Sequence, residues 1–360
     1  MKIRGNGFVG GAFVALAILA FAARTHCAVA AEPSARESHP GLDVRYESVA
    51  IGPGRSVQTV TTLPRGATNL PRIVFIPWLS CDAADYPKGP GDGWGRMLFD
   101  LARNSGAALV RVEKTGMGAG NGPKCADADL DADLAGFRAG ITHALAIPEI
   151  DRSRVFLMGG SIGASLAPGL ARGLPLAGIV VTGGHYKTWL EHMLEIERRR
   201  LRLSGSAPDK VNDAMRGYAD FYSLYLNGPM TPAAVLTKRP DLKPLWNDEP
   251  ERQYGRPARY YQQLQSLDIA STWDAVRVPV LVIYGEYDWI MSRDDQDLIV
   301  ATVNHNRPGT ATLVVVPKMD HHIALYESPE KAFREEGGRY ASLVAEEIRR
   351  WIASVKPALR

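Results

Sequence analysis

Short apolar runs alternate with amphipathic segments through most of this chain, and this alternation constrains the fold more than any other feature. The apolar runs cover residues 72–76, 108–112, 154–158, 177–182, 279–284 and 312–316, after a candidate hairpin at 44–51 and 56–62. Helical periodicity follows at 94–104, 128–146, 162–172, 294–304 and 329–355. Buried strands that alternate with helices form a parallel sheet covered on both faces. We therefore predict an α/β fold with a mostly parallel central sheet flanked by helices.

The alternation stops between residues 185 and 271, where helical stretches are separated by proline-rich joints and no clear strand is visible. We interpret this segment as a helical cap inserted into a core formed by residues 31–184 and 272–360. A cap over a cleft would pack most of its aromatic side chains in its own small core and present several to a substrate. The ten aromatic residues of the segment are Tyr186, Trp189, Tyr218, Phe221, Tyr222, Tyr225, Trp246, Tyr254, Tyr260 and Tyr261.

The first thirty residues have the pattern of a secretory signal peptide. Lys2 and Arg4 precede a nearly unbroken apolar run at 8–23, and small residues follow at 28–30. The run is shorter than the ~20 residues that a membrane span needs. We therefore expect residues 1–30 to be cleaved, leaving a periplasmic or secreted protein without stable membrane insertion.

Charge gives no indication of a nucleic-acid partner. The whole chain carries a formal charge of +3, but three basic and no acidic side chains lie in residues 1–30, so the remainder has 39 of each sign. The densest basic run, 197–202, has helical periodicity and is interpreted as a solvated face. We expect neither nucleic-acid nor anionic-membrane partners.

Ser161 is the first candidate catalytic residue, because it lies in the pattern Gly159-Gly160-Ser161-Ile162-Gly163 between a predicted strand and a predicted helix. A G-x-S-x-G turn in this context exposes the serine above the sheet, and the small neighbours allow the helix to pack closely. The backbone N–H of Ile162 would then stabilise a developing oxyanion.

An acid and a base are available in the order that such a serine requires. Asp288 follows the strand at 280–284, although Glu286, Asp294 and Asp295 are alternative carboxylates nearby. His321 and His322 follow the strand at 312–316. A serine hydroxyl needs a base to become a nucleophile, and the base needs an acid to orient it.

With these motifs in place, residues ~44–355 resemble the α/β-hydrolase-fold serine hydrolases. The segments GGSIG, VPVLVIYGEYD and PKMDHHIALYESPE are similar to the nucleophile turn, the acid loop and the histidine loop of that family. The resemblance implies Ser161 as nucleophile, Asp288 as acid and His321 as base. It also implies oxyanion donors at Ile162 and, after the strand at 73–76, at Leu79.

This chain differs from many members of the family at the second oxyanion donor. It has Pro77-Trp78-Leu79-Ser80 where many members have His-Gly. The choice of base is also open between two neighbours. Spacing from the downstream Glu327 and Pro329 indicates His322, whereas the strand end and the preceding Asp320 indicate His321, which we predict.

The resemblance also implies a disulfide. Cys27 belongs to the predicted signal peptide, which leaves Cys81 and Cys125. In this fold the strands before these two cysteines are neighbours, and an oxidising compartment favours a bond between them. We predict the disulfide Cys81–Cys125.

No cofactor or metal site is predicted. The glycines of KTGMGAGNG, residues 114–122, do not have the spacing of a phosphate-binding loop. Asp320-His321-His322 has no second ligand cluster at a plausible spacing.

The sequence thus predicts a serine hydrolase that acts on a small molecule with an apolar or aromatic acyl group, most simply an esterase. A peptidase similar to the proline iminopeptidases, which share the fold, is the alternative within the class. The alternative from another class is a catalytically silent binding protein that retains the fold.

Overall fold

A computed structural model of the chain describes residues 36–86, 92–305 and 307–356. The predicted signal peptide, residues 1–30, lies outside these ranges. The described residues form a central sheet of eight strands in the order β1-β2-β4-β3-β5-β6-β9-β10. The first four strands along the chain are β1 (Leu42–Gly52), β2 (Arg55–Pro64), β3 (Leu70–Ile76) and β4 (Ala108–Val112). The later strands are β5 (Ile150–Gly160), β6 (Gly178–Thr182), β9 (Val280–Gly285) and β10 (Ala311–Val316).

The sheet is parallel from β4 to β10, whereas β1 and β2 form an antiparallel hairpin whose second strand pairs antiparallel with β4. Its side chains alternate between two faces, as in β3, where Ile73 and Phe75 pack in one apolar cluster and Val74 and Ile76 in the other. The predicted mostly parallel sheet is confirmed.

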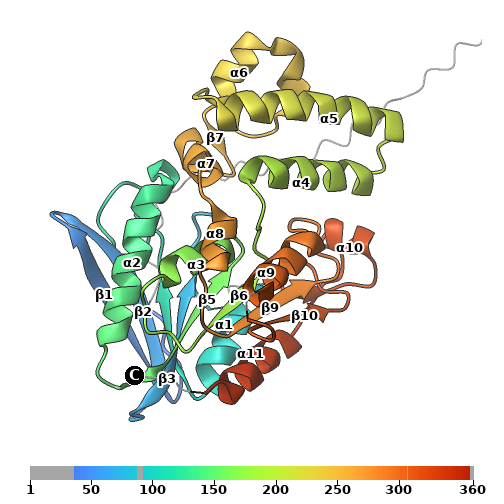
Figure 1. Cartoon of the computed structure of the whole chain (residues 1–360). Helices are drawn as coiled ribbons and strands as arrows, with labels where there is room; N and C mark the ends of the chain where they lie inside the picture. Colours follow the sequence, from blue (N-terminus) through green and yellow to red (C-terminus); the bar gives the residue numbers. More distant parts are fainter. Residues whose placement is uncertain (1–35, 87–91, 306, 357–360) are drawn as a thin grey trace, which may run out of the picture. The chain divides into compact units, whose positions relative to one another are not determined.

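Helices cover both faces of the sheet (Figure 1). One face packs against α1 (Gly93–Asn104) and α11 (Leu343–Ser354). The other packs against α2 (Leu130–Ala146), α3 (Ile162–Ala171) and α9 (Arg293–His305). This arrangement explains why the central strands are apolar on both sides.

The helix predicted over residues 329–355 is wrong, because the segment is broken. It forms α10 (Pro329–Phe333), the short strand β12 (Arg339–Tyr340) and then α11. Glu335 and Gly337 between them have φ of 55° and 76°, which a helix does not allow. Strand β12 pairs with β11 (Ala324–Leu325), which follows the predicted histidine loop.

The segment between β6 and β9 is mostly helical and lies beyond one end of the sheet (Figure 1). It contains α4 (Trp189–Leu203), α5 (Pro208–Tyr222), a π-helical turn (Ser223–Asn227), α6 (Pro232–Lys238), a 3₁₀ helix (Pro240–Leu245), α7 (Ala258–Gln265) and α8 (Ile269–Asp274). Six of its ten aromatic residues have buried side chains away from the cavity described below: Tyr218, Phe221, Tyr222, Tyr225, Tyr260 and Tyr261.

The expectation of no strand in this segment is wrong in one place. Strands β7 (Arg252–Gln253) and β8 (Arg256–Pro257) form a small antiparallel hairpin. Its two turn residues, Tyr254 and Gly255, both have positive φ, as a tight hairpin turn requires. None of the helices in the described part of the chain is both long and apolar enough to cross a membrane.

Candidate active site

Ser161 stands in the turn from β5 to α3 with φ of 55°, a conformation that a residue with a side chain rarely adopts. Its N–H donates to the carbonyl oxygen of Thr182 on the neighbouring strand, at 2.9 Å. A side chain on Gly163 would collide with the carbonyl oxygen of Ile76, and one on Gly160 with the ring of Trp94. The small residues around Ser161 therefore allow the close packing that holds the strained turn.

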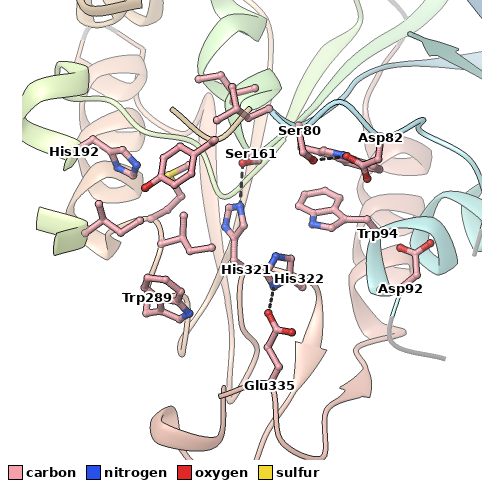
Figure 2. A pocket seen from close by; sticks show the side chains of 18 of the residues that line it. Ser80, Asp82, Asp92, Trp94, Ser161, His192, Trp289, His321, His322 and Glu335 are labelled. Atoms are coloured by element: carbon pink, nitrogen blue, oxygen red, sulfur yellow. Dashed lines mark hydrogen bonds and ion pairs between the residues drawn. The ribbon is translucent and has the colours of Figure 1, made fainter. Parts of the chain in front are cut away.

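His321 connects Ser161 to Asp288. Its Nε2 lies 3.0 Å from Ser161 Oγ and its Nδ1 lies 2.8 Å from Asp288 Oδ2 (the Ser161 contact is drawn in Figure 2). The second oxygen of Asp288 accepts the N–H groups of Ile290 and Met291 at 2.9 and 2.8 Å. The side chains of Ser161, His321 and Asp288 are all buried. The imidazole can thus accept the serine proton while the carboxylate holds its ring in place.

The alternative carboxylates have other roles in the structure. Glu286 accepts the N–H of Lys318 at 2.8 Å, and Asp294 pairs with Lys187 at 2.8 Å. Asp295 is buried and accepts the N–H groups of Tyr186 and Lys187. Only Asp288, of these four carboxylates, bonds the imidazole of His321.

His322 points away from Ser161, toward Asp320 at 3.4 Å and Glu335 at 3.9 Å, and 47% of its side chain is exposed (Figure 2). Partial burial lowers the pKa of His322, but the hydrogen bond and charge of Asp320 and the charge of Glu335 outweigh this and raise the pKa above its usual value. Asp320 also accepts the N–H groups of His322 and Ala324. Asp320 therefore orders the loop that presents His321.

Ile162 and Leu79, the predicted oxyanion donors, line the same cavity as Ser161. Ile162 is the first residue of α3, so its N–H has no acceptor within that helix. Leu79 belongs to a loop fixed by Asp82, whose carboxylate accepts the indole N–H of Trp78 at 3.0 Å and whose carbonyl accepts Lys114 Nζ at 2.8 Å.

The predicted disulfide joins Cys81, in this loop, to Cys125 in a 3₁₀ turn (Cys125–Asp127). It closes a separation of 44 residues, which in the chain-entropy account stabilises the fold by about 4 kcal/mol. Arg256 of β8 donates to Cys125 and forms a fully buried ion pair with Asp133 of α2. The disulfide thus ties the Leu79 loop to the Cys125 turn, and Arg256 ties this turn to the segment between β6 and β9.

The cavity at Ser161 has a volume of about 560 Å³, and most of its wall is aromatic or aliphatic. Figure 2 shows His192 and Trp289 on one side of the Ser161–His321 pair and Ser80, Asp82 and Trp94 on the other. The aromatic residues of the wall are Trp78, Trp94, Trp189, Tyr254, Trp289 and Tyr326. Of the ten aromatic residues counted in the predicted cap, only Trp189 and Tyr254 belong to this wall.

Helix α4 also contacts the loop that carries Asp288, which the sequence did not reveal. Arg199 donates to the carbonyl oxygens of Trp289 and Ile290, both at 2.7 Å. The interpretation of residues 197–202 as a solvated face is therefore wrong for Arg199. Arg200 forms hydrogen bonds to Tyr218 and Glu197. Arg198 is exposed, as that interpretation expects.

Within the described ranges, no cluster of three His, Cys, Asp or Glu side chains has the arrangement of a metal site. The arrangement around Ser161 joins a hydroxyl, an imidazole and a carboxylate by hydrogen bonds, as in a nucleophilic hydrolase site.

Comparison with known proteins agrees with this fold. The curated Esterase EstD of Thermotoga maritima is 22% identical over 299 residues, which are 81% of this chain and 64% of that protein. Est1E of Butyrivibrio proteoclasticus, solved with ferulic acid bound, aligns with 86% of this chain and 98% of its own at a TM-score of 0.56 and 14% identity. Carboxyl esterase 2 of Tuber melanosporum aligns with 88% of each chain at a TM-score of 0.51 and 17% identity.

The chain spans less than two thirds of the length of Esterase EstD, and the two solved structures share its fold. Residues 73–336, nearly three quarters of the sequence, match the family described as the alpha/beta hydrolase family. The chain belongs to the alpha/beta hydrolase family.

Proposed function

We propose that this protein is a carboxylic-ester hydrolase that acts through an acyl-enzyme. The observation that carries the proposal is the continuous hydrogen-bonded series from Ser161 Oγ through the His321 ring to Asp288. His321 takes the serine proton as Ser161 attacks the ester carbonyl carbon, and then gives that proton to the leaving alcohol. Water, deprotonated by the same imidazole, releases the acid and regenerates the serine.

The backbone N–H groups of Ile162 and Leu79 hold the negative charge that develops on the carbonyl oxygen. A donor of this kind typically contributes 10²–10³-fold to kcat. The disulfide and the contacts of Asp82 support this role for Leu79, because they fix the loop next to Ser161.

The substrate is a small molecule with an apolar or aromatic acyl group. The six aromatic residues of the cavity wall support this, since a cavity lined by rings favours a planar apolar group. Est1E, which shares the fold, has been solved with an aromatic acid, ferulic acid, bound.

The protein acts in the periplasm or outside the cell, after removal of residues 1–30. The Cys81–Cys125 disulfide supports an oxidising compartment, where such bonds persist.

Labelling with a fluorophosphonate probe, together with turnover of p-nitrophenyl esters and aminoacyl-nitroanilides, tests the proposal. The wild-type protein should be labelled and should cleave the esters in preference to the anilides. Ser161→Ala should not be labelled and should lose at least ~10³-fold in kcat. Preferred cleavage of the anilides would make the protein a peptidase, and absence of both labelling and turnover would overturn the hydrolase proposal in favour of its rival, a catalytically silent binding protein.

A further inference from the structure

His192 is a buried imidazole at the candidate active site that the proposed reaction does not use. It lies on α4, its side chain is 1% exposed, and it lines the cavity on the side of Ser161 opposite Trp94 (Figure 2). Its Nδ1 has no hydrogen-bond partner among the residues that the structure describes. Because this atom is closed off from solvent, Nε2 is the ring nitrogen that a ligand in the cavity can reach.

The ring of His192 is held in place by its neighbours. Trp189, one turn earlier on α4, packs against it with ring centroids 4.7 Å apart, and His185 lies at 5.5 Å. His185 is itself fixed by Ser165, whose Oγ lies 2.7 Å from its Nδ1 and accepts its backbone N–H at 2.8 Å. His192 is therefore oriented before any ligand arrives, which lowers the entropy cost of binding.

The chemistry around His192 selects a neutral partner. Burial, followed by the nearby His185 and Arg199, lowers the pKa of His192 well below its usual value, so the ring is uncharged at neutral pH. Its neighbours on the cavity-facing side of α4, Trp189 and Ile196, are apolar. A neutral imidazole has one donor and one acceptor, and a hydroxyl group can satisfy either.

We propose that His192 is a specificity-determining residue whose imidazole binds a hydroxyl group on the aromatic part of the substrate. The preferred substrates are then esters of hydroxylated aromatic acids. This inference rests on the proposed esterase function, and it assigns the substrate class of the same site. The aromatic wall binds the ring of the acyl group, and His192 distinguishes a hydroxylated ring from a plain one.

The test compares methyl 4-hydroxycinnamate with methyl cinnamate, each rate being normalised to the hydrolysis of the same ester by hydroxide. The wild-type protein should prefer the hydroxylated ester at least ~10-fold in kcat/KM, in line with the cost of an unpaired buried polar group. His192→Phe should lose this preference, so that the ratio of kcat/KM for the two esters falls toward one. His192→Gln, which keeps a donor and an acceptor, should retain part of it.

His305→Phe is the control, because His305 is an exposed histidine on α9 that is not part of the cavity wall. It should keep the wild-type preference. An equal loss of kcat/KM on both esters in His192→Phe would overturn the inference. A wild-type kcat/KM ratio near one between the two esters would also overturn it, and this measurement does not depend on the folding of a variant. Failure of the proposed function is distinguishable, because the wild-type protein would then not cleave p-nitrophenyl acetate either.

Discussion

Two adjacent histidines differ in their partners: His321 bonds Ser161 and Asp288, whereas His322 lies beside Asp320, which orders the loop that carries both. We expect His321→Ala to lower kcat by at least ~10³-fold, because it removes the group that accepts the serine proton. His322→Ala should cost less than ~10-fold, since the half-exposed His322 pairs with Asp320 and Glu335 and not with Ser161 or Asp288. Turnover of p-nitrophenyl acetate, with melting temperatures for both variants, measures this. An inactive His322→Ala beside an active His321→Ala would contradict the assignment.

At the scale of elements, Arg199 joins helix α4 to the loop that carries Asp288. Its two hydrogen bonds hold the carbonyl oxygens of Trp289 and Ile290. The N–H groups that follow these carbonyls in the chain, on Ile290 and Met291, donate to Asp288 and orient it. We expect Arg199→Ala to lower kcat ~10-fold or more, because hydrogen bonds to a charged group contribute about 1.5–3 kcal/mol.

Arg198→Ala is the matched control for that measurement. Arg198 is the neighbour on the same helix, is exposed, and has one long hydrogen bond, 3.4 Å to Asn212. It should leave kcat within a factor of two. Equal losses in the two variants would mean that a general effect on α4, rather than the grip on the Asp288 loop, causes the change.

At the scale of the whole molecule, the buried His185 makes the fold sensitive to acid. Burial lowers its pKa to about 4, although the charge of Asp295 acts in the opposite direction. An unfolded chain binds the proton near pH 6.5, so the free energy of unfolding falls as pH decreases from about 6.5 to about 4, by up to ~3 kcal/mol for this group. Urea unfolding across this range should give a shallower pH dependence for His185→Gln than for the wild-type protein. His305→Gln, at an exposed histidine, should keep the wild-type pH dependence of the free energy of unfolding. The same pH dependence in all three proteins would refute the role of His185.

The parts of the molecule that the sequence predicted correctly are those with a local signal. Buried strands have continuous apolar runs, and a parallel sheet places the residues after them at one edge, which is why Ser161, Asp288 and His321 could be grouped before the structure was known. The hairpin at Tyr254 was missed because two-residue strands have no periodicity, although Gly255 marks its turn. The roles of His192 and Arg199 depend on how α4 packs on the core, which no local pattern encodes.

Helix α4 carries Trp189, His192 and Ile196 on the cavity wall and Arg199 against the Asp288 loop. The segment above the sheet is therefore not a separable module. A laboratory exchange of this helix for that of another hydrolase would alter substrate choice and the alignment of Asp288 in one step. Natural or directed evolution of new preferences should proceed more readily through single substitutions at positions 189, 192 and 196, with Arg199 kept.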